Sequence, residues 1–182
     1  GSIGKAFPSL DVKIDEPDRD GIGELLVKGD TVMLGYYDNE EATREAIDND
    51  GWFHTGDLAR IDEEGYIFIS GRKKFVIVLK NGKNIFPEEI EALINKIEGV
   101  KESFVYGKPE DDGDYKICAK VVYDAEQMRE LYNLEKEEEI KDFIWQEIKK
   151  VNKTMPAYKY VRDVIVTDEE LIKTTTQKIK RF

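Results

Sequence analysis

Residues 66–97, YIFISGRKKFVIVLKNGKNIFPEEIEALINKI, decide the fold because the hydrophobic period changes within them. The first part has the pattern of a strand that ends at Gly71-Arg72. The apolar run 75–79 predicts another strand, followed by a turn at residues 80–83. A helix is then predicted from Pro87, since the missing N–H of proline costs nothing in the first helical turn. The stretch therefore joins a β-rich region to a region of mixed structure, with the boundary immediately before Arg72.

The region before this boundary, residues 1–71, consists mostly of predicted strands. Leu10, Val12 and Ile14 alternate with polar residues, which is the period of a half-buried strand. Further strands are predicted at residues 25–28, 58–61 and 66–69, and a helix with an acidic first turn at residues 39–47. The last two strands flank a glycine-containing turn and are typical of a hairpin.

The region after the boundary, residues 72–182, alternates helices and strands. Ile90, Leu93, Ile94 and Ile97 have helical spacing. Strands are predicted at 103–106, 117–123 and 161–166, and a second helix at 137–151. This order predicts a small α+β domain with its helices packed on a short sheet, so the fold class of the whole chain is α+β.

The composition limits the partners of the chain. The sequence has 28 Lys and Arg against 39 Asp and Glu, and a net charge of −11 disfavours nucleic acid. One cysteine, Cys118, and one histidine, His54, exclude an internal disulfide and a Cys/His zinc site, and they fit a reducing, cytoplasmic location. The longest apolar run, residues 75–79, is too short for a membrane span. A start without Met inside a β-like segment predicts a fragment, although Gly1-Ser2 also fits a cloning scar.

Two short motifs in the first region have residue types suited to a nucleotide. In Thr55-Gly56-Asp57 the glycine permits close approach of the backbone, and the aspartate can accept hydrogen bonds from a sugar diol. The alternative is an ordinary turn with an aspartate cap. Arg72 is a fork-shaped donor that suits a ribose or a phosphate, and its alternative is a surface basic cluster with Lys73 and Lys74.

Two further candidates lie in the second region. Gly82 is either a turn glycine with positive φ or a position where a side chain would block a passing ligand. Lys178 is either a phosphate-binding lysine or part of a frayed basic tail. The sequence contains neither a phosphate-loop motif nor a dinucleotide-binding glycine motif, so no self-contained nucleotide site is predicted.

Several motifs taken in their order along the chain resemble the C-terminal part of AMP-forming acyl-CoA synthetases, in the adenylate-forming superfamily. They are Gly1 to Lys5, Gly23-Glu24-Leu25, Val32 to Tyr37, Asp50 to Asp57, Gly65 to Arg72, Pro87 to Glu91 and Lys178 to Arg181. The segments 151–159 and 173–181 are most similar to the long-chain fatty acid branch.

This resemblance implies a two-step reaction. A fatty carboxylate attacks the α-phosphate of ATP to give acyl-AMP and pyrophosphate, and the CoA thiol then displaces AMP. By resemblance, Asp57 binds the ribose, Arg72 makes a second contact to the nucleotide and Lys178 contacts the α-phosphate. Lys74 is the hinge of a mobile lid, residues 72–182, and Gly82 lines the path of the pantetheine arm.

The resemblance also implies a partner within the same polypeptide. Residues 1–71 correspond to the end of a large AMP-binding lobe, whose remaining N-terminal part supplies the phosphate loop, the Mg²⁺ ligands and the fatty-acyl tunnel. We therefore expect this chain to be inactive alone. Two alternatives remain open: a nonribosomal-type adenylation domain that loads a carrier protein, and a non-catalytic interaction module that retains the fold.

Overall fold

The computed structural model describes residues 1–175 and 179–181, and they form two compact units, Gly1–Val76 (unit 1) and Ile77–Phe182 (unit 2). The division follows Val76, whereas the sequence placed the boundary before Arg72. The reason is that Arg72 still pairs with a strand of unit 1 and Lys73 binds a carboxylate there.

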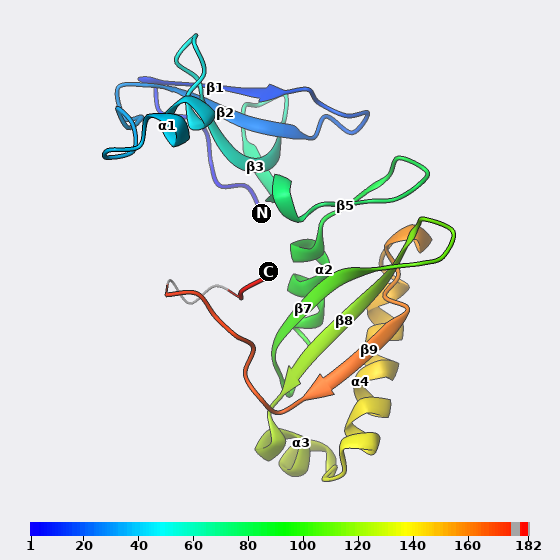
Figure 1. Cartoon of the computed structure of the whole chain (residues 1–182). Helices are drawn as coiled ribbons and strands as arrows, with labels where there is room; N and C mark the ends of the chain where they lie inside the picture. Colours follow the sequence, from blue (N-terminus) through cyan, green and yellow to red (C-terminus); the bar gives the residue numbers. More distant parts are fainter. Residues whose placement is uncertain (176–178, 182) are drawn as a thin grey trace. The chain divides into compact units, whose positions relative to one another are not determined.

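Unit 1 is built on an antiparallel sheet of four strands in the order β1-β2-β3-β4 (Figure 1). The strands are β1 (Leu10–Asp15), β2 (Gly23–Gly29), β3 (Phe53–Ile61) and β4 (Ile67–Arg72). Helix α1 (Glu40–Ala46) begins after Asn39, whose side chain accepts a hydrogen bond from the Ala42 N–H. Leu25, Ala59 and Ile67 form a small buried core on the sheet.

Strand β3 begins at Phe53, earlier than the predicted start at Leu58. Thr55-Gly56-Asp57 therefore lies inside the strand and not in a turn before it. The sequence conceals this because Gly56 interrupts the alternating pattern, and its φ of +70° is a left-handed conformation that favours glycine.

Unit 2 has a three-stranded sheet and a short hairpin. The sheet consists of β7 (Val100–Pro109), β8 (Tyr115–Tyr123) and β9 (Asp163–Thr167), with β7 antiparallel and β9 parallel to the central β8. The hairpin pairs β5 (Ile77–Val78) with β6 (Asn84–Ile85). Its first strand is shorter than predicted because Lys73–Phe75 forms the 3₁₀ turn η1.

Three helices complete unit 2: α2 (Pro87–Ile94), α3 (Ala125–Tyr132) and α4 (Glu137–Asn152), with a 3₁₀ turn η2 at Ala157–Lys159. Helix α2 packs on β7 and α4 packs on β9, and their apolar faces join the sheet in one core (Figure 1). Ile140, Ile144 and Ile148 of α4 are buried. Burial of each such side chain contributes about 1.5–3 kcal/mol.

The expected α+β fold is thus confirmed, although the sequence did not predict α3. In that helix only Met128 is buried, so it lacks a strong apolar stripe. Among the residues that the structure describes, no helix is long and apolar enough to cross a bilayer.

Candidate nucleotide site

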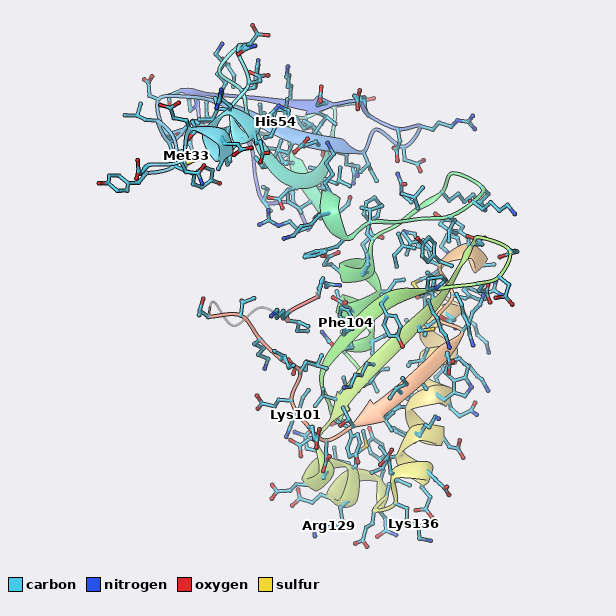
Figure 2. The ribbon with its side chains drawn as sticks, viewed as in Figure 1. Met33, His54, Lys101, Phe104, Arg129 and Lys136 are labelled. Carbon is cyan, nitrogen blue, oxygen red and sulfur yellow. The ribbon has the colours of Figure 1, made fainter. Side chains whose placement is uncertain are left out.

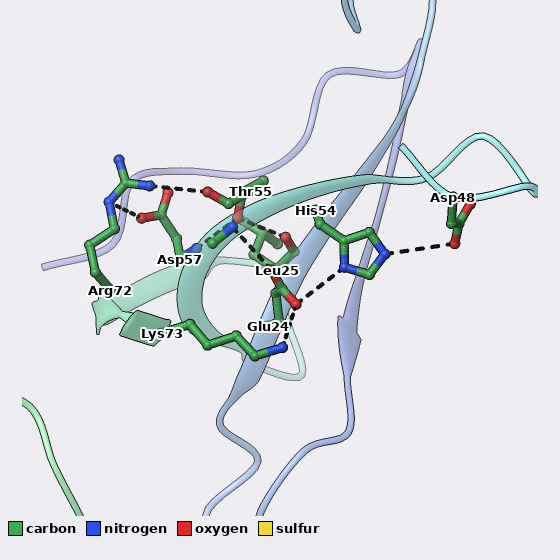
Figure 3. Close-up of polar contacts among 9 residues, drawn as sticks. Glu24, Leu25, Asp48, His54, Thr55, Asp57, Arg72 and Lys73 are labelled. Carbon is green, nitrogen blue, oxygen red and sulfur yellow. Dashed lines mark hydrogen bonds and ion pairs between the residues drawn. The ribbon is translucent and has the colours of Figure 1, made fainter. Parts of the chain in front are cut away.

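The structure brings Asp57 and Arg72 together on adjacent strands of unit 1. They are cross-strand partners in β3 and β4, and Arg72 Nε lies 2.9 Å from Asp57 Oδ1 (Figure 3). The side chain of Asp57 is 29% exposed and that of Arg72 is 43% exposed. Arg72 therefore orients one carboxylate oxygen of Asp57, and the Asp57 side chain remains partly exposed to solvent.

A bulge in β3 sets the position of Asp57. Leu26 pairs with His54 and Glu24 pairs with Leu58, so the three residues 55–57 stand opposite the single residue Leu25 of β2. Extra residues in one strand disrupt the ladder locally and re-aim the side chains. The pairing of Asp57 with Arg72 follows a second register shift, between β3 and β4, where Leu58 pairs with Gly71 and Ala59 pairs with Ile69, so that Ser70 is the extra residue of β4.

Side chains satisfy the backbone groups that the bulge removes from the ladder. The Gly56 N–H donates to Glu24 Oε1 at 3.1 Å, and the Asp57 N–H donates to Thr55 Oγ1 at 3.0 Å. The Thr55 hydroxyl donates to the Leu25 carbonyl at 2.8 Å, and Arg72 Nη1 donates to the Thr55 carbonyl at 3.0 Å. These hydrogen bonds stabilise the bulge, because buried backbone groups without hydrogen-bond partners would destabilise the fold.

Glu24 is the buried centre of the network in Figure 3. Its side chain is only 7% exposed, and its Oε2 lies 2.8 Å from Lys73 Nζ and 3.2 Å from His54 Nδ1. His54, labelled in Figure 2, also approaches Asp48, at 3.9 Å between Nε2 and Oδ2. A carboxylate of β2 therefore contacts both the bulge of β3 and the turn η1 that follows β4.

The contacts of Glu24 change the pKa values of the paired groups. Burial raises the pKa of the Glu24 carboxyl, but the hydrogen bonds from Lys73 and His54 outweigh it, and the pKa lies below its usual value. The hydrogen bond to Glu24 raises the pKa of the Lys73 ammonium. Glu24 and Lys73 therefore form a charged pair at neutral pH.

The two other described candidates lie outside this network. Lys74 is exposed in η1 near the end of unit 1, with its Nζ 4.8 Å from the Phe75 ring centroid. Gly82 is exposed in the β5–β6 turn, where its N–H donates to the Leu79 carbonyl at 2.8 Å. Its φ is +78°, and a Cβ added there would meet no atom within 4 Å.

The predicted catalytic residue Lys178 lies outside the described residues, but the chain on either side of the gap is held. Lys173 and Ile179 form an isolated antiparallel β-bridge, and the Lys180 N–H donates to the Ile172 carbonyl at 2.8 Å. Arg181 Nη2 lies 2.6 Å from Glu91 Oε2, with both side chains 9% exposed.

Glu91 is a buried carboxylate of α2. Its Oε1 accepts the Val105 N–H at 2.7 Å. The Arg181 guanidinium lies 5.3 Å from the ring centroid of Phe104 on β7, a residue labelled in Figure 2. Burial raises the pKa of Glu91, and the hydrogen bonds from Arg181 and Val105 only partly offset it.

The sequence alone assigned no role to Glu24, Lys73 or Glu91. The partners of Glu24 are 30 and 49 positions away, so no local spacing connects them. The only signal was a glutamate between Gly23 and Leu25 in an apolar strand, where a charge needs a partner.

Comparison with known proteins now identifies the class. Residues 89–178 match the AMP-binding enzyme C-terminal domain. The resemblance to the C-terminal part of AMP-forming acyl-CoA synthetases is thereby confirmed.

CoA ligases are among the proteins similar to this chain. The chain is 40% identical over 134 residues to long-chain-fatty-acid–CoA ligase FadD13 of Mycobacterium tuberculosis, covering 71% of this chain and 26% of the relative. It is 47% identical over 111 residues to 2-succinylbenzoate–CoA ligase of Listeria monocytogenes, covering 61% and 22%. The chain spans about a quarter or less of the length of the curated relatives it matches.

The fold has a solved counterpart in o-succinylbenzoate CoA synthetase (MenE) from Bacillus subtilis. In complex with its acyl-adenylate intermediate, that structure superposes with a TM-score of 0.77 at 28% identity, covering 98% of this chain and 34% of the other. The same enzyme is also known with ATP and magnesium ion bound.

Proposed function

We propose that this chain is part of an AMP-forming acid–thiol ligase that activates a fatty acid with ATP and transfers the acyl group to CoA. In this proposal unit 1 belongs to the large AMP-binding lobe and unit 2 is the mobile lid that pivots at Lys74. A cytoplasmic location is part of the same proposal.

The observation that carries the proposal is the Asp57–Arg72 pair at the bulge of β3. A carboxylate offers two oxygens with about four lone-pair sites, and Arg72 Nε lies 2.9 Å from one oxygen. The partly exposed carboxylate has the acceptor capacity to bind the two hydroxyls of a ribose. Arg72, whose guanidinium has five N–H donors, would add the second nucleotide contact.

Two residues of unit 2 are proposed to act in the two steps of the reaction. Lys178 would contact the α-phosphate and the attacking carboxylate, and Gly82 would line the pantetheine path. Mg²⁺, when bound to ATP, neutralises phosphate charge. Among the described residues no group of three or more His, Cys, Asp or Glu side chains is arranged for a metal, so we assign no magnesium ligand to this chain.

The acid is proposed to be a fatty acid because segments 151–159 and 173–181 resemble the long-chain branch and FadD13 is among the relatives. The relative named 2-succinylbenzoate–CoA ligase shows that similar chains occur in ligases named for other acids. The acid is therefore the part of the proposal to test first.

The experiment is an activity assay of the complete enzyme that contains this chain. With ATP, Mg²⁺ and CoA, we expect acyl-AMP and acyl-CoA from long-chain fatty acids in preference to amino acids, aryl acids and 2-succinylbenzoate. Amino-acid adenylates transferred to a carrier protein would contradict the proposal. Product formation by the 182-residue chain alone would contradict its assignment as an incomplete enzyme.

A substitution tests the site itself. Asp57→Asn should raise KM for ATP by about 10-fold, because a hydrogen bond to a charged group contributes about 1.5–3 kcal/mol. The matched control is Asp62→Asn, since Asp62 Oδ1 accepts the N–H groups of Glu64 and Tyr66 in the β3–β4 turn and asparagine keeps an oxygen for those contacts. An unchanged KM in Asp57→Asn would remove the ribose role.

A further inference from the structure

The bulge that carries Asp57 depends on one carboxylate of the neighbouring strand. Glu24 Oε1 accepts the Gly56 N–H, directly beside Asp57 in the chain. Gly56 has a φ of +70°, so this N–H points away from the regular ladder. Moving Glu24 would therefore release the backbone next to the proposed ribose ligand.

The same carboxylate also holds the segment that follows Arg72. Glu24 Oε2 lies 2.8 Å from Lys73 Nζ, and Lys73 is the first residue of η1. The lysine side chain is 59% exposed, and an exposed pair alone would contribute little. Here the partner is 7% exposed, so loss of the ammonium leaves a buried charge with less compensation.

We propose that Glu24 is a positioning residue for the nucleotide site, and this inference rests on the proposed function of Asp57 and Arg72. One carboxylate fixes the bulge on β3 through Gly56 and the end of β4 through Lys73. Asp57 and Arg72, the two proposed nucleotide contacts, lie beside these two anchors. Glu24 acts on the ligand only through them.

The proposal predicts a split between KM and kcat in the complete enzyme. Glu24→Gln keeps an oxygen for the Gly56 N–H but loses the charge that binds Lys73. We expect KM for ATP and for supplied acyl-AMP to rise about 10-fold, with kcat at saturation changed less than about 2-fold. A purely structural role would lower the amount of folded enzyme, and hence kcat per total protein, without moving KM.

A second pair of variants covers the case in which Glu24→Gln does not fold. Lys73→Met keeps the apolar stem at an exposed position and should raise KM for ATP about 3-fold. Lys73→Arg restores a cation and should return KM toward the original value. Asp62→Asn again serves as the carboxylate control in the same unit.

The outcomes separate this inference from the function on which it rests. If Asp57→Asn raises KM for ATP while Glu24→Gln and Lys73→Met leave it unchanged, Glu24 has no positioning role and the proposed function stands. If the original enzyme forms no acyl-AMP, or if Asp57→Asn leaves KM unchanged, the proposed nucleotide site fails and the inference fails with it.

Discussion

Each unit contains a buried glutamate, Glu24 in unit 1 and Glu91 in unit 2, and the surroundings of the two carboxylates differ. Glu24 of unit 1 and Glu91 of unit 2 have side chains 7% and 9% exposed. Burial raises both pKa values. Lys73 and His54 reverse the effect at Glu24, whereas Arg181 and the Val105 N–H do not reverse it at Glu91.

This difference shows that exposed area alone does not decide the charge of a buried acid. Glu91 extends from α2, between Ile90 and Ile94 of the main core, and Glu88 adds a like charge nearby. Glu24 lies at a bulge, where the strand pairing is interrupted and several polar groups can reach its carboxylate. Unit 1 thus holds a charged network beside a proposed ligand site, and unit 2 holds a carboxylate that folding makes harder to ionise.

The largest expected effect is at Lys178 of unit 2, and it tests whether adenylation depends on a residue that thioester formation does not need. In the complete enzyme, Lys178→Ala should reduce the adenylation rate by about 10²–10³-fold, the usual cost of removing one donor that stabilises transition-state charge. Thioester formation from supplied acyl-AMP should persist. The control is Lys180→Ala, an exposed lysine of the same segment. Equal loss in both steps, or none, would contradict the assignment and favour the non-catalytic alternative.

The next effect concerns the buried pair of unit 2. Arg181→Met leaves Glu91 without its guanidinium and should lower the free energy of unfolding of unit 2 by about 3 kcal/mol at neutral pH. The loss should be smaller in mild acid, because a carboxyl with a raised pKa takes up a proton readily. Fluorescence of Trp145 during chemical denaturation reports on unit 2, provided that Trp52 is replaced by Phe.

A double variant checks the cause of that loss. Adding Glu91→Gln to Arg181→Met removes the buried charge and keeps an acceptor for the Val105 N–H, so stability should partly return. If the double variant is as unstable as the single one, the charge on Glu91 is not responsible.

A smaller effect is expected at the turn of unit 2. In the complete enzyme, Gly82→Leu should spare adenylation and slow the CoA step by on the order of 10-fold, since small displacements of reacting groups cost up to about 100-fold. Gly113→Leu is a matched control, because Gly113 has a φ of +83° in another open turn of unit 2. Similar losses in both variants would indicate backbone strain and not a pantetheine path.

The smallest effect is the pH dependence of the two units. The lowered pKa of Glu24 stabilises unit 1 above the ordinary glutamate pKa of about 4.3, and this stability is lost as the pH falls through the folded-state value. The raised pKa of Glu91 acts oppositely: its contribution to unit 2 declines as the pH rises from about 4.3 through the folded-state value. Single-tryptophan variants that retain Trp52 or Trp145 can follow each unit. Glu24→Gln and Glu91→Gln should each remove one of these trends.

The sequence predicted those parts of the fold that have a regular hydrophobic period. Helix α4 and strands β7 and β8 were found because apolar residues repeat at helical or alternating spacing. Helix α3 was missed because Met128 is its only buried residue. The bulge of β3 was missed because three residues opposite one break the alternation.

The site was predictable residue by residue but not as a network. Asp57 and Arg72 were selected separately, and the structure pairs them across two strands. Glu24 could not be selected from spacing, since its partners come from η1 and β3. Only the three-dimensional pairing of β2, β3 and β4 brings these charges together.

The parallel pairing of β8 with β9 has a consequence for the order of folding. In unit 1 short connections join β1 to β2 and β3 to β4, whereas the two parallel strands β8 and β9 of unit 2 are separated by α3 and α4. Contacts between distant segments form more slowly than local ones. During synthesis at about 5–20 residues per second, β8 leaves the ribosome seconds before β9. The nascent sheet of unit 2 thus spends that interval with one edge of β8 unpaired, a period in which chaperones have access to it.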